Sequence, residues 1–383
     1  MKYLVWATTA LMASTAMTQA GGIERSQQSV GILFEEGNYV ELSYSFVEPD
    51  VSGETVFAVP PGPGPIPAGQ NSRNMAGVYP NLAFSFKTAI TENLDVALVL
   101  DSPFGADVSY PAPGAPPNAY LYGGSTAEIN TQALTLMARY RFENNFSILG
   151  GVRALSSVGT VALFNGYTME ADGGTELGYL LGVAYERPDI ALRVALTYNS
   201  AITHTYNALE TPALIPTTFE TTMPQSVNLE FQSGIAADTL LFGSIRWVDW
   251  SEFDISPFVY VNNPGNPLGD ALVDYDNDTI TYQIGVGRRF TENWSGAATL
   301  THEPSTGGFS GNLGPTDGRT AVGLAASWTN GMIEITGGVQ YSWIGDATTE
   351  TPAALTGGVE GVPFANFQDN TTTAAGIRIG YSF

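Results

Sequence analysis

The chain has 383 residues, of which 37 are acidic and 14 are basic, so its formal net charge is -23 at pH 7. This acidic balance argues against nucleic acid as a partner, and the absence of cysteine excludes disulfides and thiolate metal sites. The 43 glycines and the low charged fraction of 13% suit lipid-facing strands joined by tight turns.

The first 20 residues have the pattern of a bacterial export signal. Met1-Lys2-Tyr3 is followed by an apolar run from Leu4 to Met17, and then by Thr18-Gln19-Ala20. A charged start, a short apolar run and a small-residue end are the three parts of a secretory signal peptide. The apolar run is shorter than the ~20 residues that a membrane-spanning helix needs. We expect cleavage after Ala20.

From Tyr39 to Phe383 the chain alternates apolar and polar residues in fourteen short segments. Alternate side chains of a strand point to opposite faces, so each segment predicts a strand with one apolar face. Bacterial membrane barrels have an even number of strands. The final strand ends in Phe383, which resembles the assembly signal of outer-membrane barrels. The predicted strands cover 40–46, 82–87, 94–101, 134–142, 146–153, 177–186, 192–199, 227–232, 241–247, 280–286, 294–300, 322–328, 333–343 and 375–383.

The connections between these segments alternate in length, as they do in outer-membrane barrels. Short turns alternate with long segments near 51–78, 104–125, 162–174, 205–218, 251–278, 304–318 and 345–370. A soluble sandwich would turn its apolar faces inward and would not need an aromatic residue at nearly every short turn. We therefore predict an all-β fold, in which residues 38–383 form a 14-stranded antiparallel transmembrane β-barrel. The aromatic residues beside the short turns, typical of an interfacial girdle, are Phe142, Phe146, Tyr185, Phe231, Phe290, Trp294, Trp328 and Phe383.

Several short stretches, in this order and spacing, resemble the FadL family of outer-membrane transporters of long-chain fatty acids and aromatic hydrocarbons. They are 79–84, 94–105, 223–227, 247–253, 282–287, 302–305 and 381–383. The resemblance implies a barrel plugged by an N-terminal hatch, with a kink in the third strand that opens a lateral gate to the bilayer. Ser102, Pro103, Phe104 and Gly105 match the kink position. Proline cannot donate to a strand ladder and glycine weakens it, so these residues predict either a kink or simply the strand's end.

The front of the chain departs from that family. Only residues 21–37 precede the first strand, and the Asn-Pro-Ala motif of the usual hatch is absent. We predict a short N-terminal luminal hatch whose first residues reach into the lumen. The candidate ligand-binding residues of lumen and hatch are Gly21, Gly22, Ile23, Arg25, Arg153, Arg246 and Phe242.

Basic residues fall mostly on the predicted inner face, and two roles for them remain open. An inward arginine can hold a ligand carboxylate by bidentate contact, or it can pair with an inward acid. Phe242 belongs to a set of inward apolar residues that predicts a partly apolar lumen. That set is Leu149, Leu155, Leu180, Phe242 and Val248.

Two outer loops carry apolar residues on an otherwise acidic rim, and such exposed patches often mark binding sites. We predict an outer capture site made by Leu163, Phe164, Leu209, Leu214 and Ile215. The alternative is that these loops only pack on each other.

The sequence offers no catalytic site, metal site or cofactor site. The histidines His204 and His302 are interpreted as surface or rim residues, because a serine hydrolase needs a histidine beside its serine. Asp274–Asp278 alternates acidic residues like the start of a calcium loop. Calcium binding stays open, since position six is Thr279 and position twelve is Gly285.

The expected function is diffusion-driven uptake of hydrophobic compounds, with long-chain fatty acids as the expected cargo, across the bacterial outer membrane and with lateral release into the bilayer. The expected partners are these small molecules, outer-membrane lipid and the barrel-assembly machinery. A general porin with a water-filled lumen is the first alternative, and an outer-membrane lipid hydrolase is the second.

Overall fold

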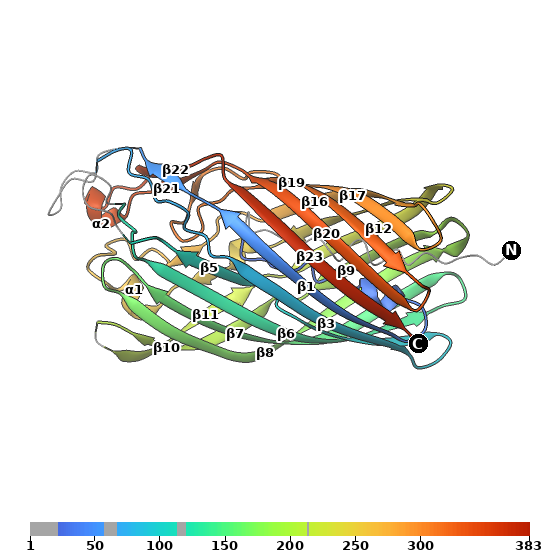
Figure 1. Cartoon of the computed structure of the whole chain (residues 1–383). Helices are drawn as coiled ribbons and strands as arrows, with labels where there is room; N and C mark the ends of the chain where they lie inside the picture. The colour runs from blue at the N-terminus through green and yellow to red at the C-terminus, as the bar shows by residue number, and fades with distance from the viewer. Residues whose placement is uncertain (1–21, 57–66, 113–119, 213) are drawn as a thin grey trace.

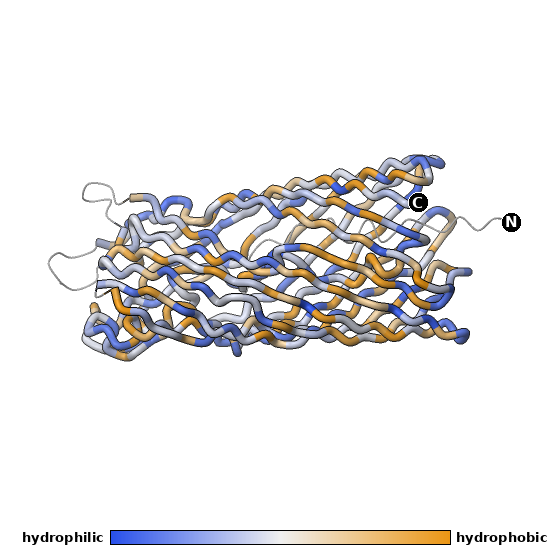
Figure 2. The backbone as a smooth tube through the Cα atoms, turned by 90° about the horizontal axis from the view of Figure 1, so that it is seen from below, coloured by the Kyte–Doolittle hydropathy of each residue, from blue (hydrophilic) through white to orange (hydrophobic). Residues whose placement is uncertain are grey.

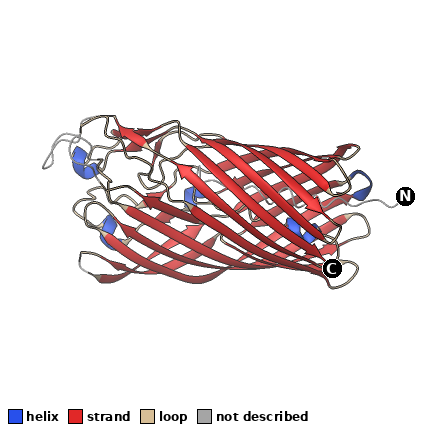
Figure 3. Cartoon of the chain, viewed as in Figure 1, coloured by secondary structure: helices blue, strands red, loops and turns tan. Residues whose placement is uncertain are grey.

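The alternating segments form one closed barrel. The computed structural model describes residues 22–56, 67–112, 120–212 and 214–383, and it shows an elongated barrel of long tilted strands (Figures 1 and 3). The predicted signal peptide and Gly21 lie outside the described residues. Among the described residues no helix is both long and apolar enough to cross a membrane.

Fourteen strands make up the wall, three of them interrupted, so that they appear as 17 segments of one sheet. Every neighbouring pair is antiparallel, and β1 pairs with both β3 and β23, which closes the barrel. The predicted fold class is thus confirmed. The strands are β1 (Tyr39–Asp50), β3 (Tyr79–Ala89), β4 (Leu94–Asp101) with β5 (Gly105–Ser109), β6 (Thr126–Arg141), β7 (Phe146–Ala162), β8 (Thr168–Arg187), β9 (Leu192–Asn199) with β10 (Ile202–Glu210), β11 (Ile215–Met223) with β12 (Ser226–Ala236), β13 (Thr239–Val248), β16 (Thr279–Arg289), β17 (Trp294–Glu303), β19 (Arg319–Thr329), β20 (Ile333–Ile344) and β23 (Thr371–Ser382).

The strand faces divide as the alternation predicts. Leu42, Leu136 and Leu181 are exposed on the outside, whereas Thr135 and Arg153 are buried inside. The hydropathy-coloured tube of Figure 2 accordingly alternates between apolar and polar along the strands, with hydrophilic turns at the end where the C-terminus lies. An apolar exterior around a polar interior is the arrangement of a transmembrane barrel.

The long connections gather at one end of the barrel, and the C-terminus lies at the other (Figure 1). Three of these connections form a separate four-stranded sheet, which packs on Tyr110 and Tyr120 through Phe364 and Phe367. No described helix has more than four residues, and the two α-helices, α1 and α2, have four each. The elements of this end are β2 (Gly53–Thr55), β18 (Phe309–Ser310), β21 (Ala347–Glu350), β22 (Pro363–Phe367), β14 (Asp254–Ile255), β15 (Val273–Asp274), α1 (Phe258–Val261) and α2 (Ala353–Thr356).

Candidate functional site

The site is built around the N-terminal segment, which we define as residues 22–37. It contacts the inner wall of the barrel along its length and includes the short 3-10 helix η2 (Gly31–Phe34). Ile23 is buried among Phe104, Trp250 and other apolar side chains. A side chain at Gly22 would collide with the Trp250 ring, so only glycine fits there.

A buried ion pair fixes the start of this segment. The Arg246 guanidinium donates from Nε to both carboxylate oxygens of Glu24, at 3.1 and 2.9 Å, and it also donates to Asn228. Both side chains are almost completely buried. Removing one partner of such a pair leaves a buried charge without compensation, which typically costs about 3–5 kcal/mol. Glu24 is therefore the strongest single tie between the N-terminal segment and the wall.

Arg153 is likewise occupied by the protein. Its Nε donates to Thr135 Oγ1 at 3.0 Å, and another nitrogen donates to Gln28 of the N-terminal segment. Next to it Ser26 donates to the Asp101 carboxylate at 2.8 Å. Arg153 and Arg246, two of the predicted luminal arginines, therefore both bind the N-terminal segment. Their structural role is to hold this segment against the wall.

The third strand is interrupted between Asp101 and Gly105 and then continues. The β3–β4 ladder ends at the pair Phe84 and Leu100, whereas β5 resumes pairing with β6. Tyr79–Ala83 of β3 and residues 102–105 consequently face each other without a shared ladder in the described chain. We call this interruption the wall gap. The sequence predicts either a kink or the end of the strand here. Because the strand continues as β5, the break is a kink.

The N-terminal segment bridges the wall gap from inside. On one edge the amide of Arg25 donates to the Pro103 carbonyl at 2.7 Å, and the amide of Gly105 donates to the Ile23 carbonyl at 2.8 Å. On the other edge Asn81 donates through its side chain to the Arg25 carbonyl at 3.1 Å. These bonds replace the missing ladder, so that the gap is closed by a segment that belongs to neither strand.

The Arg25 side chain occupies the gap itself. Its guanidinium lies 4.3 Å from the centre of the Tyr79 ring, and Nη1 reaches Asn130 Oδ1 at 3.4 Å. A Cβ atom at Gly105 would collide with this guanidinium. A larger residue at this position would therefore have to displace the Arg25 side chain from the gap.

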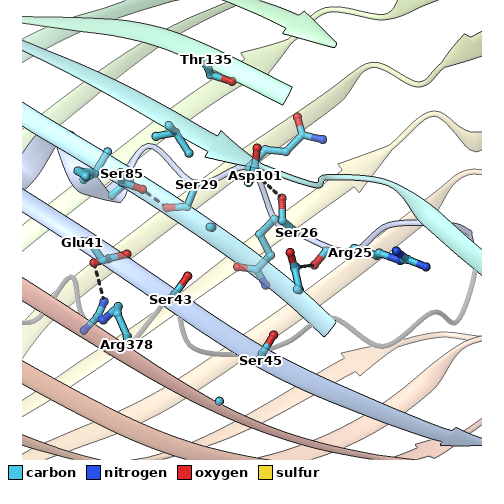
Figure 4. Close-up of a pocket in the computed structure, with 18 of the residues that line it drawn as sticks. Arg25, Ser26, Ser29, Glu41, Ser43, Ser45, Ser85, Asp101, Thr135 and Arg378 are labelled. Atoms are coloured by element: carbon cyan, nitrogen blue, oxygen red, sulfur yellow. Dashed lines mark hydrogen bonds and ion pairs between the residues drawn. The ribbon is translucent and has the colours of Figure 1, made fainter. Parts of the chain in front are cut away.

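Two cavities adjoin the N-terminal segment. The larger, of about 160 Å³, lies between the segment and strands β1, β3 and β23 and is lined by polar and charged groups, among them Ser43, Ser45 and Ser85 (Figure 4). The smaller, of about 60 Å³, lies on the loop side of Ile23 and is almost wholly apolar. Its lining includes Ala106 and Val108 of β5, so the apolar cavity extends to the strand that follows the wall gap.

The charges that line the polar cavity balance each other. Arg378 pairs with Glu41 and Glu334, as Figure 4 shows for Glu41, and Arg153 lies beside Asp101. A ligand carboxylate would have to displace one of these acids.

No known protein-family model matches this sequence, and neither does any curated protein sequence. Solved structures do match in fold. A FadL homologue of Pseudomonas aeruginosa superposes with a TM-score of 0.72 at 14% identity, over 97% of this chain and 96% of the other. The chain has a FadL-type fold. The toluene transporter TodX of P. putida gives a TM-score of 0.58 at 10% identity over 91% of both chains. The toluene transporter TbuX of Ralstonia pickettii gives 0.58 at 12% identity, over 92% of this chain and 90% of the other.

In this FadL-type barrel the predicted outer capture residues differ in exposure. Leu163 is buried against Tyr206 and Ala208, and Phe164 packs edge-on to Tyr122. Phe164 is nevertheless exposed, and so are the other three: Leu209 alternates with inward residues of β10, and Leu214 and Ile215 follow at the hairpin tip. Leu163 is thus buried, and the capture site stays a prediction.

The interpretation of His204 as a rim histidine is wrong. Its side chain is 0% exposed, because it lies on the inward face of β10 between Ile202 and Tyr206. Residues alternate between buried and exposed from Ile202 to Glu210, which is the pattern of a strand. The pattern is hard to recognise in the sequence, because the outward residues include the polar Thr203 and Thr205 and the segment therefore resembles a loop. His302 is exposed and bonded to Thr320. Phe242 is fully buried, as expected for an inward residue.

No group of three or more potential metal ligands occurs in the described part of the chain. In Asp274–Asp278 only Tyr275 is partly buried, and the other four residues are classed as exposed.

Proposed function

We propose that this FadL-type barrel lies in the bacterial outer membrane and passes hydrophobic compounds by diffusion, without catalysis. The apolar exterior of the strands supports the membrane location. The fold shared with two toluene transporters supports a hydrophobic cargo. The observation that carries the proposal is the apolar cavity beside an interrupted wall.

The proposed route runs from the outer loops through the apolar cavity and sideways through the wall gap. Burying an apolar solute is worth about 0.8 kcal/mol per methylene, and a watery exit would lose this for each carbon. Leu100, in the last β3–β4 pair, and Leu82, just beyond that pair on β3, are exposed apolar side chains on the outer wall beside the gap. A solute leaving here would pass directly onto an apolar surface.

For the cargo we propose uncharged hydrocarbons ahead of long-chain fatty acids. Arg153, Arg246 and Arg378 each have acidic neighbours, so a fatty-acid carboxylate would compete with Asp101, Glu24 or Glu41. The apolar cavity offers no cation of its own. A neutral solute needs no such exchange.

The test closes the wall gap. Replacing Pro103 with valine and Gly105 with threonine should extend the β4 ladder and displace the Arg25 side chain from the break. We expect uptake of labelled toluene to fall severalfold in cells that insert the barrel normally. The matched control is Gly337→Thr, an outward position of β20 where a new side chain meets nothing. Undiminished uptake in the closed variant would rule out the lateral route. Parallel measurements with labelled oleate decide between hydrocarbon and fatty-acid cargo.

A general porin is the second candidate function, and the polar cavity favours it. Its lining runs from Asp101 near the wall gap to Glu35 near the opposite end of the N-terminal segment. Small inward side chains such as Ser43 and Ser45 leave room for water there. Under this alternative, closing the wall gap would leave uptake unchanged while polar solutes would still pass.

A further inference from the structure

Two inward polar side chains, one of which lines the apolar cavity, each have one buried atom without a hydrogen-bond partner in the described structure. His204 of β10 and Thr221 of β11 are cross-strand neighbours that both face inward. Their exposed fractions are 0% and 2%, and neither His204 Nε2 nor Thr221 Oγ1 has a partner in the described structure. Leaving a buried polar group without a hydrogen bond costs about 1–3 kcal/mol of folding free energy. Two such groups side by side therefore suggest a function that offsets this cost.

The hydrogen bond of the other ring nitrogen defines what His204 can accept. Nδ1 lies 3.0 Å from the carbonyl oxygen of Gly173, which can only accept. Nδ1 therefore carries the proton of the neutral ring, and Nε2 presents a lone pair. The Thr221 hydroxyl next to it can donate. Together they offer one acceptor and one donor.

The surroundings of this pair are apolar. Thr221 lines the 60 Å³ cavity together with Ile129, Phe219 and Val273. Tyr206 also lines it, but its hydroxyl is already bonded to Ser157. Among the described residues that line this cavity, Thr221 alone has a buried side-chain atom without a partner. A ligand that fills this mostly apolar cavity could therefore bond to the Thr221 hydroxyl without displacing a hydrogen bond of the protein.

We propose that His204 and Thr221 form a subsite for the hydroxyl group of a small neutral hydrophobe, of the phenol class. This rests on the proposed function and specifies its cargo. The ligand hydroxyl donates to His204 Nε2 and accepts from Thr221 Oγ1, while the ring contacts the apolar lining. The ligand ring would contact apolar lining residues that include Leu272 and Val273.

The experiment compares phenol with toluene, which differ by a hydroxyl in place of a methyl group. Binding of each to the purified full barrel in nanodiscs is measured by NMR titration. We expect phenol to bind more tightly than toluene relative to their partition into empty nanodiscs. Thr221→Val should reduce phenol affinity about fivefold, the worth of one hydrogen bond, and leave toluene affinity unchanged. The matched control is Thr222→Val, the same change at the neighbouring position on the other face of β11.

His204→Phe provides the second variant, since it removes the acceptor and keeps the ring. It should also lower phenol affinity and spare toluene. If toluene binds but phenol gains nothing, or if both variants keep the phenol preference, the subsite is wrong while the proposed function stands. If neither compound binds the wild-type barrel, the subsite and the hydrophobic-cargo proposal both fail.

Discussion

Phe34, a single aromatic residue, holds the far end of the N-terminal segment. Its ring lies between two guanidinium groups, those of Arg139 and Arg193, each 4.5 Å from the ring centre. Cation–π contacts are worth about 0.5–2 kcal/mol each, and more when water is excluded. With Glu24 paired to Arg246 at the other end, the segment is fixed at both ends by arginines of the wall.

Asp274 is the residue whose charge state should make an outer loop sensitive to pH. Burial raises its pKa, and the neighbouring Asp276, Asp254 and Asp270 raise it further. The folded loop therefore binds a proton more strongly than the unfolded loop. The resulting stabilisation is full below the unfolded pKa near 3.8 and is lost as the pH rises through the raised folded value.

Acidification should thus stabilise the loop that contains β14 and β15. We expect hydrogen exchange of residues 252–276, corrected for the intrinsic rate, to slow severalfold between pH 7 and pH 4. Asp274→Asn should give slow exchange already at pH 7 and weaken the pH dependence. Asp346→Asn, at an exposed position outside this loop, is the control. An unchanged pH dependence in Asp274→Asn would show that another group is responsible.

At the scale of elements, the sequence predicts the membrane strands well and their outer extensions poorly. Alternation finds strands wherever lipid requires apolar outward residues, as at Leu177 and Tyr179 of β8. Beyond the apolar band the outward residues become polar, for example Glu170 and Glu220. Strands β10 and β11 then resemble loops, although their ladder of nine residue pairs is unbroken.

The site was predictable only in part, for a related reason. Pro103 and Gly105 identify the wall gap, because their backbone properties act locally. The partners of Arg153 and Arg246 were not predictable, since residues Glu24 and Gln28 lie far away in sequence and no spacing rule links them. The role of His204 Nε2 as an acceptor was not predictable either, because it follows from the bond between His204 Nδ1 and the carbonyl of Gly173, 31 residues away.

The last strand, β23, leads to a prediction about assembly. The Phe383 amide donates to the Asn38 carbonyl at 3.0 Å, and its exposed ring stacks on Tyr381. These contacts are few, so deleting Phe383 should barely change the folded barrel. If the assembly machinery recognises this end, the deletion should instead slow insertion in cells. The folded fraction is followed by heat-modifiable gel migration after a pulse of synthesis, with Phe383→Tyr as the conservative control. Equal insertion rates would exclude an assembly role.

At the scale of the whole molecule, closure of the wall and filling of the lumen are separate. The ladders of β1 with β3 and β23 close the ring of strands without the N-terminal segment, which bridges only the local wall gap. The lumen is filled by that segment, which binds inward side chains of β4, β7, β12 and β13 through Asp101, Arg153, Glu230 and Arg246. We therefore expect the barrel wall to form even when the N-terminal segment is absent from the lumen.

Deleting residues 22–36 should consequently leave an inserted barrel that conducts ions. The charged groups released by the deletion, such as Arg153 and Arg246, would face water in an open lumen instead of being buried unpaired, so the cost to folding is small. In planar bilayers we expect steady ion currents from the deletion variant and few openings from the intact chain. A deletion of residues 357–361 in an outer loop serves as the control, because it removes no described contact with the N-terminal segment. If the variant inserts and carries no more current than the intact chain, the N-terminal segment does not close the lumen, and the outer loops must be the barrier.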